Sequence, residues 1–192
     1  MPPPPFLACG KRRRPEAAWM KATVNTMRDL MILRYAKIFL TACVGLLALL
    51  VGLDNIFDYG TNFAGVQHIL SMDTIPPGSP MAWRAIDSKL LHHLTYDFIM
   101  AMEIGSGALC LAGAWRLVRV RMEDAKTFNA AKGLAISGLT TALGLYFLGF
   151  EIIGGEWFQM WRSNGWNMQE PAFRFIGSVG VILLFLNQRD ED

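Results

Sequence analysis

Four long apolar segments dominate the pattern of hydrophobic and polar positions along the chain. One of them, residues 133–150, contains no charged side chain on any face of a helix, whereas a helix in a water-soluble protein needs a polar stripe. A helix of about 20 apolar residues crosses a bilayer. The pattern therefore predicts an all-α, polytopic membrane protein, a bundle of four transmembrane helices. The expected spans are about residues 35–53, 94–115, 133–155 and 172–187.

The loop between the first two spans, residues 54–93, has helical signals of its own. Ser79 followed by Pro80 is typical of a helix start, because serine caps the free backbone N–H groups and proline suits the first helical position. Apolar residues recur at helical spacing earlier in the loop: Phe63, Val66, Ile69 and Leu70. We therefore expect a short helical cap over one end of the bundle.

Lysine and arginine are distributed unevenly among the segments that join the spans. Thirteen of them precede or begin the first span or lie in residues 116–132, whereas residues 54–93 and 156–171 hold three. Cytoplasmic loops of membrane proteins carry the excess of these residues. The bias predicts that both termini are cytoplasmic and that the cap is periplasmic. The net charge of +2 thus reflects topology, and no nucleic-acid partner is expected.

The first 30 residues are rich in proline and basic side chains and lack the apolar core of a signal peptide. They predict a disordered tail, followed by one membrane domain over residues 31–192. The three cysteines, Cys9, Cys43 and Cys110, supply no pair in an outward loop, so no structural disulfide is expected.

Charged side chains gather toward the periplasmic ends of the spans, where they predict a polar layer. The candidates are Asp54, Asp97, Glu103, Glu151 and Arg174. Arg174 enters the fourth span from the same side as the acids, and we expect it to neutralise Asp97 or Glu151. Glu103 is the deepest, and a charge there costs about 2.5 kcal/mol or more without a partner. It should be neutral, or face the bundle interior.

All three histidines lie on the same side and are candidate ligands or proton carriers: His68, His92 and His93. Three interpretations remain open for this layer. It can lock the helices structurally, it can bind a metal or carry protons, or it can hold a small ligand such as haem or a quinone. The spacing matches no recognised ligand signature, so no cofactor is predicted and the metal, if any, is unknown. Nucleotide loops, nucleophile elbows and Cys-x-x-Cys pairs are absent from the sequence, which argues against an enzyme.

Several longer stretches resemble the bacterial family of predicted small integral membrane proteins carried as a domain of unknown function. They are Leu53-Asp54-Asn55, residues 58–63, residues 66–74, His92-His93, Glu103, residues 154–161 and residues 172–175. The similarity covers about residues 34–192. It implies a four-span protein of the bacterial inner membrane and brings no activity, cofactor or catalytic residue.

The sequence favours a non-enzymatic accessory or scaffold subunit whose partners are the lipid bilayer and other membrane proteins. The alternative is a membrane component that binds a metal, haem, quinone or proton through its outward His/Asp/Glu layer. The two classes differ in the role of Glu103, which is only structural in a scaffold subunit and functional in a binding component.

The charge bias makes the topology testable. Reporter fusions placed after Gln67 and after Glu123 are expected to report opposite compartments, periplasmic and cytoplasmic respectively, because the two positions are separated by one span. Paired alkaline phosphatase and fluorescent-protein fusions measure this. The same compartment for both positions would overturn the four-span topology.

Overall fold

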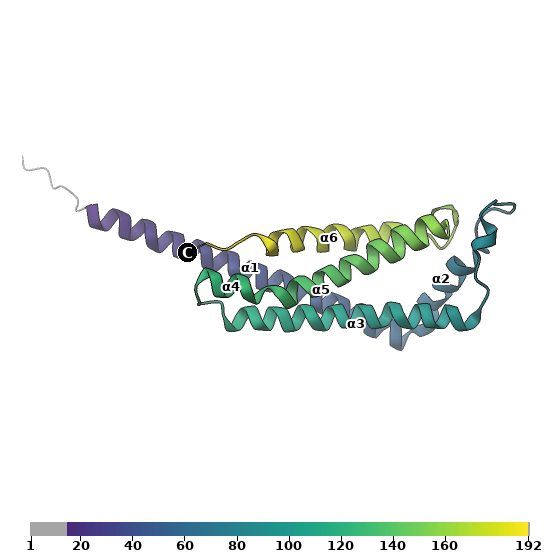
Figure 1. Ribbon diagram of the computed structural model, residues 1–192, viewed down its shortest axis with the longest axis horizontal. Coiled ribbons are helices and arrows are strands. Elements are labelled where there is room, and N and C mark those ends of the chain that lie inside the picture. The colour runs from purple at the N-terminus through teal and green to yellow at the C-terminus, as the bar shows by residue number, and fades with distance from the viewer. Residues whose placement is uncertain (1–14, 192) are drawn as a thin grey trace, which may run out of the picture.

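The computed structural model describes the backbone of residues 15–191 and the side chains of residues 28–191. Within this part of the chain every regular element is a helix (Figure 1). Four helical stretches are long and apolar enough to cross a membrane: Arg28–Phe57, Lys89–Arg119, Ala125–Trp157 and Gln169–Asn187. The predicted all-α fold with four spans is confirmed.

The first span belongs to α1 (Pro15–Phe57), which is 43 residues long. Because α1 begins at Pro15, it includes residues 15–30 of the expected tail. Residues 1–14 lie outside the described part of the chain. In Figure 1 the start of α1 extends beyond the end of the bundle where the C-terminus lies.

The second span is α3 (Lys89–Arg119), and Ser88 caps its start by accepting a hydrogen bond from the N–H of Leu91 at 3.4 Å. The helix packs against α1 on one side and against the third span on the other. At 31 residues it is about 46 Å long, which exceeds the hydrocarbon core of a bilayer by more than 10 Å. Its ends therefore reach into the headgroup layers.

Three helical pieces make up the third span: α4 (Ala125–Ala131), α5 (Gly133–Gly144) and η2 (Leu145–Trp157). In η2 the chain is wound as a π-helix, whose hydrogen bonds reach five residues back, as from Phe158 N to Ile153 O at 2.9 Å. Such turns are rare and are frequent at functional sites. The last span, α6 (Gln169–Asn187), packs on η2 and α5 and also contacts α1.

Glycines let the helices approach closely. A Cβ atom on Gly107 of α3 would lie 2.9 Å from both the O atom of Gly45 and the N atom of Leu49 in α1. On the opposite side of α3, a Cβ atom on Gly113 would overlap the backbone of Ala135 in α5. The small-residue spacing in the sequence thus corresponds to real helix contacts, as expected where van der Waals packing drives association.

Large apolar side chains cover the outside of the four spans, where lipid replaces water. Phe39, Phe98, Val181 and Leu184 are each at least 60% exposed. Exposed apolar surface on this scale is unusual for a soluble monomer and is typical of a membrane-facing surface. The buried core between the helices includes Leu117, Phe128, Ala135, Leu139 and Leu186.

A helical cap closes the end of the bundle that lies opposite the C-terminus (Figure 1). It contains α2 (Tyr59–Ser71) and two short turns, η1 (Ala82–Arg84) and η3 (Met160–Arg162). Three side-chain contacts join its two loops: Thr74 Oγ1 to Ser163 Oγ (2.7 Å), Ser79 Oγ to Gln159 Oε1 (3.0 Å) and Arg84 Nη1 to Trp157 O (3.1 Å). The helix expected around residues 63–70 is present, and the predicted cap is ordered.

The close crossing of α3 and α5 predicts that Gly113→Ala destabilises the protein by about 1–3 kcal/mol, because the added methyl group has no room. Gly105→Ala, on the same helix, has nothing within 4 Å of its new Cβ atom and should change stability by less than about 0.5 kcal/mol. Unfolding of both variants in detergent measures the difference. Equal stability of the two variants would contradict the close crossing.

Candidate functional site

The most deeply buried acid of the cap-side half is Glu103 of α3, which is 3% exposed. Its Oε2 accepts a hydrogen bond from Asn55 Nδ2 at 2.7 Å, and its Oε1 accepts one from the Tyr146 hydroxyl at 3.2 Å. Both partners are neutral donors, and Glu103 forms no ion pair with any described side chain of residues 28–191. The carboxyl group faces the bundle interior, as expected for an acid at this depth.

The hydrogen bonds continue from Glu103 to the cap. Asn62 of α2 donates from Nδ2 to Asn55 Oδ1 at 2.6 Å, and the Tyr96 hydroxyl donates to the Asn55 carbonyl at 3.4 Å. Asn55 near the end of α1 therefore connects the cap helix with the buried acid. Four elements meet at this network, which we call the Glu103 network: α1, α2, α3 and η2.

A cavity of about 180 Å³ opens beside the Glu103 network. An engineered cavity of about 150 Å³ in another protein holds benzene, so this space is large enough for a ring or a group of that size. Its lining includes Glu103 and Asn55 and is otherwise mostly apolar and aromatic. The aromatic lining residues are Tyr96, Tyr146, Phe150 and Phe175.

A second, apolar cavity of about 140 Å³ adjoins the first. The two share Val66 and Ile69 of α2, Ile99 of α3 and Phe150 of η2. Phe98, which is exposed to the lipid side, lines the second cavity as well. The two cavities together thus offer the polar groups of Glu103 and Asn55 and an apolar space that is lined in part by a lipid-facing side chain.

The predicted pairing of Arg174 is wrong. Its Nη2 atom lies 2.6 Å from Glu170 Oε1, one turn earlier in α6, and both side chains are at least 75% exposed. An arginine near the start of α6 reaches its own helical turn more easily than the acids of other spans, because the i and i+4 positions are neighbours on a helix. An exposed pair of this kind contributes no more than about 0.5 kcal/mol.

The other members of the expected layer lie apart. Asp97 accepts a hydrogen bond from the Tyr59 hydroxyl at 3.1 Å on the exposed surface. Burial, and then this bond to Asp97, raise the pKa of Tyr59, so the phenol stays protonated as a donor. Glu151 instead faces α6, where Gln169 Nε2 lies 3.2 Å from its Oε2, and Asp54 is exposed. Among the described residues, these cap-side charges therefore form no ion pair with one another.

The three histidines have separate partners as well: His68 lies 2.9 Å from Asp73, His92 Nε2 lies 2.6 Å from Ile86 O, and His93 Nδ1 lies 2.8 Å from the Tyr59 hydroxyl. His93 also stacks on Phe63, and His68 stacks on Trp166. Among the described residues, no group of three or more His, Cys, Asp or Glu side chains is arranged to hold a metal ion. The geometry joins none of the histidines to Glu103.

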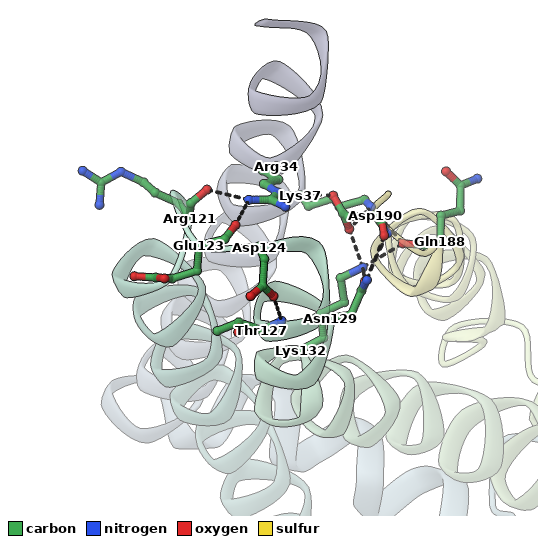
Figure 2. A network of polar contacts seen from close by, with 10 residues as sticks. All are labelled: Arg34, Lys37, Arg121, Glu123, Asp124, Thr127, Asn129, Lys132, Gln188 and Asp190. Atoms are coloured by element: carbon green, nitrogen blue, oxygen red, sulfur yellow. Dashed lines mark hydrogen bonds and ion pairs between the residues drawn. The ribbon is translucent and has the colours of Figure 1, made fainter. Parts of the chain in front are cut away.

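A second buried network lies at the C-terminal end of the bundle and was not predicted (Figure 2). Asp190 is held between cations from the first and third spans: Lys37 Nζ and Lys132 Nζ lie 2.7 and 2.6 Å from its Oδ2. Arg34 Nε lies 3.8 Å from its Oδ1, and all three cations are buried. The signal in the sequence was Lys37 inside the first apolar span and Lys132 directly before the third.

Backbone carbonyls supply the remaining acceptors of this Asp190 network. Lys37 and Lys132 both donate to Gln188 O, at 2.9 and 2.7 Å, and Asn129 Nδ2 donates to Asp190 O at 2.9 Å. Arg34 donates to the carbonyls that follow the second span, 2.6 Å from Glu123 O. The final residues of the chain are thereby fastened to α1, α4 and α5 (Figure 2).

Burial alone would raise the pKa of the Asp190 carboxyl, but the hydrogen bonds and charges of Lys132 and Lys37 outweigh it and lower that pKa. A carboxyl whose pKa is lower in the folded than in the unfolded protein stabilises the fold above its unfolded pKa, about 3.9. That contribution is lost as the pH falls through the folded value. The C-terminal fastening is therefore fully present at neutral pH.

The fold and both polar networks define a four-span integral membrane protein with a buried acidic pocket. Residues 33–189 match the family model described as "Predicted small integral membrane protein (DUF2165)", a domain of unknown function. The chain belongs to this family, as the resemblance of its sequence stretches implied. Comparison with curated proteins and comparison with solved structures give no match.

The Asp190 network predicts that Asp190→Ala destabilises the protein by about 3 kcal/mol at pH 7, because it leaves buried cations without their carboxylate. Glu191→Gln removes the neighbouring, exposed carboxylate and should cost less than about 0.5 kcal/mol. Thermal unfolding in detergent measures both variants. A stability loss that is equally small in the two would mean that the final residues are not fastened in this way.

Proposed function

We propose that this protein is a non-enzymatic binding protein of the bacterial inner membrane, with both termini in the cytoplasm and the Glu103 pocket in the periplasmic half. The excess of lysine and arginine around the C-terminal end of the bundle supports the orientation. The family description supports the membrane location. The open question for function is whether the buried acid serves a ligand or only the fold.

The observation that carries the binding function is the cavity beside Glu103. Glu103 has no cationic partner among the described side chains of residues 28–191. Its carboxyl group borders about 180 Å³ of space lined by residues of five elements. Concave, mostly apolar pockets with a few convergent polar groups are the usual form of a small-molecule site.

An accessory or scaffold role is the second candidate, and the surface of the cap favours it. Trp83 and Trp161 are 71% and 53% exposed there, and Trp157 packs edge-on against Trp83 with ring centres 6.0 Å apart. Tryptophan is common at protein interfaces and equally common as a membrane-interface anchor. The pocket is the more specific feature, so we favour binding. A metal or haem site built from the histidines has no support in their separate positions.

Filling the pocket tests the proposed function without knowledge of the ligand. Val66 lines both cavities, and Val66→Trp is expected to abolish rescue of a deletion strain while leaving membrane insertion intact, because the indole occupies the ligand space. Gln67→Trp places the same side chain one residue further along α2, on the exposed face, and should keep full rescue.

The readout is complementation of the deletion phenotype at matched protein levels, together with unfolding in detergent to show that both variants are folded. Full rescue by a folded Val66→Trp variant would overturn the binding function and leave the scaffold role as the better explanation.

A further inference from the structure

The charge requirement of the pocket points to the class of ligand. Glu103 is bordered by two neutral donors, and no lysine or arginine lines the cavity. In a medium of low dielectric constant, an ionised carboxylate needs a cation to compensate the lost hydration. Either a proton or a bound positive group can meet this requirement, whereas an anionic ligand would add a second uncompensated charge.

The aromatic walls supply a second preference for positive charge. Tyr146 stacks on Phe175 with ring centres 4.3 Å apart and lies 5.5 Å from Phe150, so three rings gather on one side of the cavity. Aromatic faces carry negative electrostatic potential and attract substituted ammonium ions, most strongly where water is excluded. The Phe150 and Phe175 rings offer no ligand to a small metal ion, the Tyr146 hydroxyl already donates to Glu103, and Asn55 Oδ1 already accepts from Asn62.

We propose that the cavity beside Glu103 binds a substituted ammonium ion, with the carboxylate as its counter-ion and the rings of Tyr146, Phe150 and Phe175 as its walls. This inference rests on the proposed binding function and names the ligand class for that pocket. The cavity of about 180 Å³ accommodates a trimethylammonium group with a short chain, and the adjoining apolar cavity provides room for a larger apolar substituent.

Free ammonium compounds and lipid headgroups share this chemistry, but they differ in the phosphate. A choline or ethanolamine lipid carries a phosphodiester two carbons from its nitrogen, and the pocket lining contains no cation to receive it. The inference therefore commits to an ammonium ion without an adjacent phosphate.

The test uses the full-length protein in phosphatidylglycerol nanodiscs, which contain no amine lipid. Binding of choline, of its neutral isostere 3,3-dimethylbutan-1-ol and of phosphocholine is measured by equilibrium dialysis and saturation-transfer NMR. We expect saturable binding of choline that is at least tenfold tighter than that of the isostere and of phosphocholine. Equal binding of the isostere, or of phosphocholine, would overturn the inference.

Two variants tie the binding to the pocket. Glu103→Gln keeps the shape of the side chain but removes its charge, and it should weaken choline binding at least tenfold. Asp97→Asn removes an exposed acid from the same helix and should leave binding unchanged. If Glu103→Gln does not fold, Phe175→Leu replaces one wall of the cavity and is expected to weaken binding of choline more than binding of the isostere. Unaltered choline binding in a folded variant of either kind would refute the proposal.

The outcomes separate this inference from the proposed function. If Val66→Trp abolishes cellular function while choline fails to bind the wild-type protein, the pocket keeps its role and the ammonium class is wrong. If Val66→Trp is fully active, the proposed binding function is wrong, even if choline binds the wild-type protein.

Discussion

A polar side chain inside a bilayer has no water to bind, so it must find its partners within the protein. Both buried networks of this protein provide such partners. At the C-terminal end, Asp190 brings together cations from the first and third spans and fastens the last residues of the chain. On the cap side, Glu103 draws donors from α1 and η2. Helices that share little hydrophobic driving force in lipid are connected at both ends of the bundle in this way.

The two networks differ in whether the buried acid has a cationic partner. Asp190 has cations on both carboxylate oxygens, and backbone carbonyls accept further bonds from the same cations. Glu103 has neutral donors only, and no lysine or arginine lines the cavity beside it. An incompletely balanced buried acid is costly unless something else contributes a positive charge. For this physical reason we assign a structural role to the Asp190 network and a binding role to the Glu103 network.

Local backbone geometry shapes the cavity as much as the acid does. The π-helical winding of η2 widens its turns, and Tyr146 and Phe150 of this segment both face the cavity. Gly155 leaves room for Gln169 of α6, whose Nε2 atom would lie 2.6 Å from an added Cβ atom. Helix α6, which carries Phe175 of the pocket wall, thereby comes close to η2. Asn62 then holds α2 over the opening. A straight α-helix in place of η2 would aim these rings differently.

The sequence by itself determined the four spans, the helical cap and the burial of Glu103, because hydrophobic segments of bilayer length and a lone deep acid are local properties of the chain. The partners were decided by the tertiary structure. Arg174 pairs with Glu170 one turn away, the three histidines are drawn to separate neighbours, and Asn55 and Tyr146 meet at Glu103 from distant parts of the chain. Sequence spacing gives the depth of a residue in the membrane, but which face of its helix meets which neighbour depends on how the helices pack.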